Sequence, residues 1–322
     1  MTGTAGGLRL AVVGAGAVGG YVGGMLAAAG GDVRFLARGE TLAALRRDGL
    51  RITGGPGGPS ADRHVPAVRA SADPAELGEV DAVLLCVKTP QLTAAARALA
   101  PLLGEDTAVV TVQNGVEAPD QVASVLGRDR VLPGLARVVA VPVRPGVVRH
   151  LGPPGALGFT EWDGGVSERV LRLREALRAA ALTAAEPADV WAELWAKFLV
   201  VVPVGGLGAA TGGATVGELR SRAGTRRLLV AAMREIHGTA VRLGIGLPED
   251  AVDTAVGLVD RQAPDATSSL QRDVLAGRPS ELDAWTGAAV RLAARAGHRA
   301  PVLELLHELL AAREALAVGA PH

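Results

Sequence analysis

The hydrophobic and polar positions of the chain follow a different pattern in each half. In the first half, apolar runs rich in β-branched residues predict buried strands at residues 8–13, 32–38, 81–87 and 107–112. Helical patterns accompany these runs at residues 21–29, 41–48, 90–103 and 117–127. Alternating strands and helices are typical of a parallel sheet that helices cover on both faces.

The pattern changes after residue 130. Residues 130–160 form short β-rich pieces broken by prolines, which predicts antiparallel strands at the far side of the sheet. A helix at 167–181 and a strand at 182–186 are expected to close this region. Beyond Pro187 no strand is predicted, and the apolar periodicity predicts helices at residues 189–204, 225–243, 248–262, 265–276, 281–296 and 301–317.

We therefore expect an α/β fold with a nucleotide-binding domain at residues 1–187 and an all-helical domain at residues 188–322. A length of 322 residues suits two domains, since domains commonly hold about 100–200 residues. Residues 1–7 are expected to form a frayed tail. Residues 53–65, which are rich in glycine, proline and serine, are expected to form a loop or hairpin insertion.

The composition is that of a folded soluble protein. Hydrophobic residues make up 49% of the chain and the net charge is zero, which supplies a core and argues against binding to nucleic acid. Cys86 is the single cysteine, so no disulfide can form within the chain, and a buried thiol in a reducing cytosol is expected. Residues 10–31 carry no charge, but their many glycines favour a turn between strand and helix over a membrane span. We expect a cytoplasmic protein with no membrane partner and no metal.

A glycine-rich turn follows the first predicted strand and matches the G-x-G-x-x-G fingerprint. Its residues are Gly14, Ala15, Gly16, Ala17, Val18 and Gly19. The first glycine allows the tight turn, the second lets the backbone approach phosphates, and the third lets the helix pack closely on the strand. The start of the next helix offers free N–H groups to a pyrophosphate. We interpret the motif as a dinucleotide site; a glycine-rich turn in another α/β fold is the alternative.

The end of the second predicted strand indicates which dinucleotide binds. An acidic residue there favours NAD, whereas an arginine accommodates the 2′-phosphate of NADP. Arg38 stands at this position, with Glu40 two residues further on. We therefore expect NADP(H), and an ordinary solvated Arg38 is the alternative.

Only two lysines, Lys88 and Lys197, and one asparagine, Asn114, occur in the chain. An ammonium group can release a proton and a guanidinium cannot, so a lysine retained in an arginine-rich chain is a candidate for chemistry. Lys88 and Asn114 each end a predicted parallel strand, at the edge where ligands bind. A solvated strand end for Lys88 and a plain Asn-Gly turn are the alternatives.

Longer motifs resemble the ketopantoate reductase (2-dehydropantoate 2-reductase) family over nearly the whole chain. They are the glycine turn, Lys88, residues 113–115, residues 193–198, residues 268–273 and residues 277–283. The resemblance implies a Rossmann domain followed by a helical domain like that of 6-phosphogluconate dehydrogenase, with the active site between them. It also implies reduction of a 2-oxo acid with NADPH, here 2-dehydropantoate to pantoate in pantothenate biosynthesis, and a homodimer through the helical domain.

The resemblance also implies roles for individual residues. Lys197 is the general acid, which is sensible because hydride addition to a ketone builds alkoxide charge that an ammonium can neutralise. Glu281 orients the substrate or the lysine and lies close to the cofactor. Ser269 holds the substrate carboxylate, and Asn114 and Lys88 contact both nicotinamide and substrate. A surface lysine and a helix-terminal acid are the alternatives for Lys197 and Glu281.

One helical face departs from the family pattern. The family's lysine helix usually carries asparagines four and eight residues after the lysine, where this chain has Val201 and Gly205. These spacings share a face with Lys197, so we expect a more apolar and roomier pocket. Three hypotheses result: a 2-dehydropantoate reductase, a related NADP-dependent dehydrogenase for a less polar oxo or hydroxy acid, and a non-catalytic NADP sensor.

Overall fold

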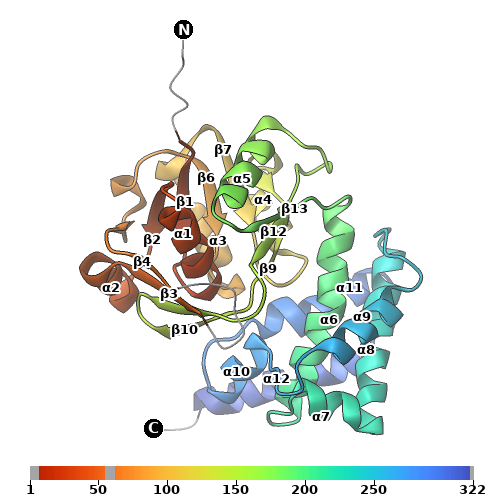
Figure 1. Ribbon diagram of the computed structural model, residues 1–322. Coiled ribbons are helices and arrows are strands. Elements are labelled where there is room, and N and C mark those ends of the chain that lie inside the picture. Colours follow the sequence, from red (N-terminus) through yellow and green to blue (C-terminus); the bar gives the residue numbers. More distant parts are fainter. Residues whose placement is uncertain (1–6, 55–61, 320–322) are drawn as a thin grey trace. The chain divides into compact units, whose positions relative to one another are not determined.

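The computed structural model describes residues 7–54 and 62–319, which form two compact units (Figure 1). The first unit contains the chain up to Gln113 together with Ala118–Val190, and the second contains Asn114–Glu117 and the chain from Trp191 onward. Most of the predicted tail at 1–7 and the centre of the predicted insertion at 53–65 lie outside the described residues.

The first unit is built on a parallel sheet in the order β5-β2-β1-β6-β7-β8. Its strands are β1 (Arg9–Val13), β2 (Asp32–Leu36), β5 (Arg69–Ser71), β6 (Val80–Leu85), β7 (Leu103–Thr111) and β8 (Val131–Leu132). Every neighbouring pair is parallel, which confirms the predicted sheet type. The strand order reverses between β1 and β6, and ligands bind outside the carboxyl ends of strands at such a reversal.

Helices cover both faces of this sheet, as predicted. They are α1 (Ala17–Ala28), α2 (Gly39–Asp48), α3 (Leu92–Arg97), α4 (Ala118–Leu126) and α5 (Glu168–Ala179), with short helical turns η1 (Pro74–Glu76), η2 (Thr89–Gln91), η3 (Ala100–Leu102) and η4 (Arg128–Arg130). Leu10 and Val12 of β1 enter the core that α1 and α5 share. Ala11 and Val13, which point the other way, enter the core of α3 and α4.

Antiparallel pairing of strands within residues 130–160 is confirmed, but the predicted placement of these strands at the far side of this sheet is wrong. Of residues 130–160, only β8 joins the sheet, and it does so in parallel. A second sheet has the order β10-β11-β3-β4, with β3 (Leu50–Gly54), β4 (Arg63–Val65), β10 (Ala140–Arg144) and β11 (Val147–His150). A third joins β9 (Gly134–Arg137), β12 (Ala156–Phe159) and β13 (Thr183–Ala185). A short strand can pair with the free edge of any nearby strand. Its own hydrophobic pattern does not specify which strand that is.

Helix α1 lies between the main sheet and the second sheet, and its glycines make this possible. A Cβ atom on Gly23 would stand 2.7 Å from the Phe35 ring of β2, and one on Gly24 would stand 2.8 Å from Ile52 of β3. The sequence interpretation assigned the crowded glycines to the turn alone. That interpretation holds for the turn but is wrong for these helix positions, where side chains of two sheets press on the backbone.

The second unit is helical. Its elements are α6 (Val190–Ala210), α7 (Val216–Ser221), α8 (Ala223–Arg242), α9 (Ala251–Arg261), α10 (Ser269–Leu275), the π-helical turn η5 (Asp283–Gly287), α11 (Ala288–Arg295) and α12 (Pro301–Gly319). Among the described residues no strand follows Val190, as predicted. The short helix α7 was not predicted. The helix predicted at 281–296 is confirmed, and η5 is a π-helical stretch near its start that leads into α11 without a break.

Helix α6 is long and apolar enough to span a membrane, and within the described residues it alone meets that test. The most apolar window of 18 residues is 61% buried inside the protein. Lys197 lies in the middle of the helix and Pro203 inside it. These features are those of the core helix of a folded unit.

Candidate functional site

The glycine turn after β1 has the geometry that its fingerprint predicts. Gly14 has a φ of +97°, which favours glycine, and a Cβ there would lie 3.0 Å from the backbone nitrogen of Val87. A Cβ on Gly19 would lie 2.0 Å from the carbonyl oxygen of Gly14. Both positions therefore exclude any larger residue, since the atoms in the way are backbone atoms.

Gly16 differs from its two neighbours in the motif. A Cβ on Gly16 would meet no atom within 4 Å, so the fold itself does not require glycine here. Gly16 is the N-cap of α1 and no side chain caps that helix, which leaves the first N–H groups without a side-chain acceptor. Open space above a bare helix N-terminus suits the pyrophosphate of a dinucleotide.

Arg38 lies at the N-cap of α2, directly after β2, and its side chain is exposed. Within residues 7–54 and 62–319 it forms no hydrogen bond or ion pair with another side chain. Glu40 follows in the first turn of α2 and is also exposed. The guanidinium is thus available at the strand end where a 2′-phosphate is expected.

Gln113 joins the ends of β6 and β7. Its side-chain amide donates to the carbonyl oxygen of Leu85 at 2.6 Å and to that of Val87 at 3.1 Å. Its own oxygen accepts from the backbone of Val112 at 3.1 Å. The residue is 6% exposed, so these bonds fix the backbone that leads into Lys88. Sequence reasoning noted Gln113 only as part of a motif, and gave it no role.

Asn114 belongs with the helical unit. The segment Asn114–Glu117 is held there by Arg291 of α11, which donates to the Glu117 carboxylate at 2.8 Å. Gly115 has a φ of +123°, and a Cβ on it would stand 3.1 Å from the carbonyl oxygen of Ala284. The glycine of the Asn-Gly pair is therefore required both by its conformation and by this close approach.

The face of α6 that begins at Lys197 continues through Val201 to Gly205. Lys197 and Val201 are partly buried. A Cβ on Gly205 would stand 2.6 Å from the Trp285 ring and 3.2 Å from the Ser268 hydroxyl. The face is apolar, as expected, but the expectation of a roomier pocket is wrong at Gly205, because Trp285 fills the space. Sequence reasoning missed Trp285, because its contact with Gly205 joins residues far apart in the chain.

Ser269 is the first residue of α10 and is partly buried. The helix start is fixed by a capping box, in which the Ser268 hydroxyl accepts from the backbone of Gln271 at 3.0 Å. Gln271 also donates to the carbonyl oxygen of Ala214 at 3.0 Å. The Ser269 hydroxyl takes no part in this network and makes no hydrogen bond in the described part of the chain, so it is available to a ligand.

Glu281 directly precedes the turn that carries Trp285, and its carbonyl oxygen accepts from the Trp285 backbone at 3.1 Å. Ser280 beside it donates to Glu314 of α12 and accepts from the backbone of Leu282 at 3.0 Å. These bonds hold the backbone on both sides of Glu281, which is partly buried.

The predicted site residues therefore fall into two groups. The structure brings together the glycine turn and the Lys88 strand end in the first unit, where Arg38 also lies. It places Asn114, Lys197, Ser269 and Glu281 in the second unit.

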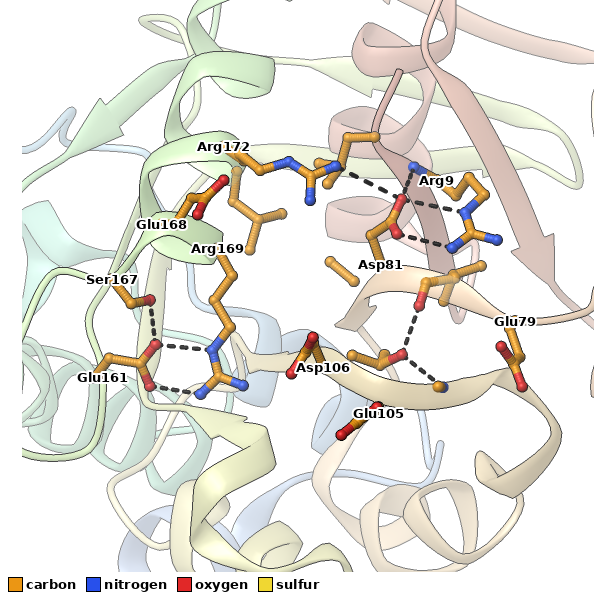
Figure 2. Close-up of a pocket in the computed structure, with 16 residues that line it drawn as sticks. Arg9, Glu79, Asp81, Glu105, Asp106, Glu161, Ser167, Glu168, Arg169 and Arg172 are labelled. Atoms are coloured by element: carbon orange, nitrogen blue, oxygen red, sulfur yellow. Dashed lines mark hydrogen bonds and ion pairs between the residues drawn. The ribbon is translucent and has the colours of Figure 1, made fainter. Parts of the chain in front are cut away.

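A charged pocket of about 680 Å³ lies elsewhere, at the amino ends of β1, β6 and β7 (Figure 2). The glycine turn is at the carboxyl end of β1, so this pocket is not part of the dinucleotide site. Arg9 pairs with Asp81 at 2.9 Å, and this hydrogen bond lowers the pKa of Asp81. Burial raises the pKa of Glu161, but hydrogen bonds from Arg169 and Ser167 outweigh it and lower the pKa overall. Three arginines and six carboxylates line this pocket, so only part of its negative charge is neutralised.

Two family models match the chain. Residues 10–164 match the family described as ketopantoate reductase PanE/ApbA, and residues 189–314 match the C-terminal domain of the same family. Together they cover both units.

Individual relatives agree with the family models. A 2-dehydropantoate 2-reductase of Mesorhizobium japonicum is 32% identical over 94% of this chain and 97% of its own length. A 2-dehydropantoate 2-reductase of Mycobacterium tuberculosis is 34% identical over the same shares. A crystal structure of a PanE/ApbA family ketopantoate reductase from Ralstonia eutropha superposes with a TM-score of 0.87 at 32% identity, covering 97% of this chain and all of that one. A D-mandelate dehydrogenase with NADH and anilino(oxo)acetate has a TM-score of 0.86 at 21% identity, which shows a shared fold.

Proposed function

Because the chain belongs to the ketopantoate reductase family, a family of oxidoreductases that uses NADPH, we propose that it reduces a 2-oxo acid to a 2-hydroxy acid. The names of its relatives make 2-dehydropantoate the first candidate substrate, with pantoate as the product and pantothenate biosynthesis as the pathway. The observation that carries the proposal is the open space at Gly16 over the uncapped start of α1, at the reversal of the strand order.

The residues present fit the dinucleotide. The pyrophosphate would rest on the turn from Gly14 to Gly19 and on the N–H groups of α1. Arg38 would bind the 2′-phosphate, which gives NADPH preference over NADH. Bound there, the nicotinamide supplies the hydride of the reaction.

The helical unit would supply the proton and the substrate contacts. Lys197 stabilises the alkoxide that forms at C2 and donates its proton to that oxygen. The Ser269 hydroxyl donates a hydrogen bond to the substrate carboxylate. Glu281 orients the lysine or the substrate and lies close to the cofactor. Asn114 and Lys88 are assigned to both nicotinamide and substrate, with Gln113 holding the backbone before Lys88 in place.

The domain roles remain part of the proposal. Residues 1–187 would bind NADP(H), and residues 188–322 would bind the substrate and form a homodimer. A cytoplasmic location is proposed on the same basis. Sedimentation of the purified protein tests the dimer, which a monomer at micromolar concentration would contradict.

A second candidate substrate is a less polar 2-oxo acid. Val201 and Gly205 stand where the family usually has asparagines, and Trp285 closes the space at Gly205. A site that hydrogen-bonds a substrate hydroxyl rejects analogues without it by about 10⁴–10⁵-fold, and an apolar wall does not have that preference.

Loss of NADPH absorbance with a panel of 2-oxo acids tests the proposal. Turnover of 2-dehydropantoate supports the first candidate substrate, and turnover of other acids alone supports the second. Tight NADPH binding without turnover of any acid contradicts reductase activity and favours an NADP sensor.

A further inference from the structure

Helix α12, the last helix of the chain in Figure 1, carries a row of exposed apolar side chains. The two most exposed large hydrophobic side chains among the described residues are Leu316, at 77%, and Leu305, at 58%. Leu309 lies between them and is 54% exposed. The opposite face of the helix is buried through Leu303 and Leu310. A single exposed leucine needs no explanation, but three in one row form an apolar patch of the kind that other proteins cover.

The row has the spacing of a coiled-coil seam. Leu305, Leu309, Ala312 and Leu316 are separated by four, three and four residues, which is the spacing of the a and d positions of a heptad repeat. Ala312 is exposed like the leucines. Because the buried face already holds α12 in its helical form, a partner helix can pack on the row without any new helix having to form.

Two charged side chains flank the row and indicate what covers it. Glu308 directly precedes Leu309, and Arg313 directly follows Ala312, so they occupy a g and an e position on opposite sides of the row. Both are exposed, and within residues 7–54 and 62–319 neither has an ion-pair partner. When two identical helices pair in parallel, a g position lies beside the e position of the next heptad in the other helix. Glu308 would then meet Arg313 of the partner subunit, and twofold symmetry would form this pair twice.

We propose that two copies of the chain pair through α12, as parallel helices related by a twofold axis. The proposal rests on the proposed homodimer and assigns its interface, and it is independent of the proposed reaction. The leucine row of each copy packs against the same row of the other, between two Glu308–Arg313 pairs. One helix from each copy makes a small interface, below about 1,200 Å² in total, and interfaces of that size belong to weak complexes. The dimer is therefore reversible and depends on concentration.

Sedimentation velocity of the full-length protein between about 1 and about 100 µM measures this association. We expect the wild type to pass from monomer to dimer in this range. Leu309→Glu should raise the dimer Kd at least about tenfold, because pairing would bury a carboxylate in the apolar row. Leu171→Glu, on α5 of the first unit, is the matched control: Leu171 is 53% exposed, and its replacement should leave the Kd unchanged.

The outcomes separate this proposal from the others. A wild type that stays monomeric overturns both the α12 pairing and the homodimer. A wild-type dimer with equal Kd values for Leu309→Glu and Leu171→Glu overturns the α12 pairing and leaves the homodimer standing. Consumption of NADPH with a 2-oxo acid tests the reaction separately in each case.

Charge exchange tests the parallel arrangement itself. Glu308→Arg and Arg313→Glu each bring like charges together at both flanking contacts, so each variant alone should dimerise at least about fivefold more weakly than the wild type. In an equal mixture, one variant supplies two arginines and the other two glutamates, so both contacts again join opposite charges. The mixture should therefore recover the wild-type Kd. A mixture that associates no more tightly than either variant alone overturns the proposal.

Discussion

Helices α1 and α6 both contain closely spaced glycines, but different kinds of neighbour pack against the glycines of each helix. In α1, the space left by Gly23 and Gly24 is taken by side chains of two sheets, Phe35 and Ile52 among them. In α6, the space left by Gly205 is taken by Trp285. The first helix thereby packs closely against both sheets. In the second, the Trp285 ring packs directly against the backbone of the helix that carries Lys197.

The difference also shows which glycines a local sequence motif can identify and which it cannot. The glycine turn before α1 is recognisable because each glycine answers a local need of backbone or phosphate. The need for Gly205 arises from a residue 80 positions later in the chain. No local pattern around α6 contains that information.

The largest effect is expected from Gly19→Ala. Its Cβ would stand 2.0 Å from the Gly14 carbonyl oxygen, which is backbone and cannot yield without breaking the turn. We expect a loss of about 3 kcal/mol or more in the free energy of unfolding, measured by urea denaturation. Gly16→Ala is the control: with no atom within 4 Å, it should keep its stability to within about 1 kcal/mol and lose NADPH affinity. Wild-type stability in Gly19→Ala contradicts the close packing of α1.

On the α6 side, Gly205→Ala should cost about 1–3 kcal/mol of unfolding free energy, because the added methyl group collides with the indole. Gly206→Ala is the matched control. Its Cβ would make ordinary contacts of 3.4 Å with Thr286 and 3.5 Å with Leu306, so the change should be neutral or stabilising. Equal stabilities for the two variants in the same denaturation experiment contradict the close contact between Gly205 and the Trp285 ring.

Arg38→Ala should act on the cofactor and leave the fold unchanged. Loss of a charge-assisted hydrogen bond to the 2′-phosphate costs about 1.5 kcal/mol or more, which raises the Kd for NADPH about tenfold. The Kd for NADH should stay unchanged, because NADH lacks that phosphate. Fluorescence titration of both cofactors measures this. A parallel rise in the two constants rules out the assigned contact.

The smallest effect concerns Cys86, which follows β6 beside the glycine turn. Burial raises the pKa of its thiol from 9.0 to about 12. The folded state therefore keeps this proton between pH 9 and 12 while the unfolded state loses it, so stability falls as pH rises through that range. Urea denaturation at pH 8 and pH 10 should show a steeper fall for the wild type than for Cys86→Ala. Equal slopes contradict the raised pKa of the Cys86 thiol.

Much of the fold follows from the sequence where apolar positions repeat along one element. The strands β1, β2, β6 and β7 and the long helices face a core with regular spacing, and periodicity found them. The strand β5 and the helix α7 are too short to show a period. The pairing of β3 with β11 joins segments far apart in the chain, so the pattern of either one carries no sign of the other.

The candidate site was predictable to a different extent. Residues such as Gly14 and Gly19 could be identified because their type and spacing match a physical requirement that the structure shows. Lys88, Lys197 and Asn114 stood out by their rarity, and their roles remain predictions. Gln113 and Trp285 were missed because each acts through a contact, to Leu85 and Gly205 respectively, that exists only in the folded chain.

In the proposed reaction, Lys197 on the altered face of α6 delivers the proton to the substrate oxygen. The most direct test is the turnover number of Lys197→Ala with the best 2-oxo acid, together with its Kd for NADPH. We expect turnover to fall at least about tenfold, since a general acid contributes about 10²–10⁴-fold, while cofactor affinity barely changes. An unchanged turnover number would contradict the role assigned to Lys197.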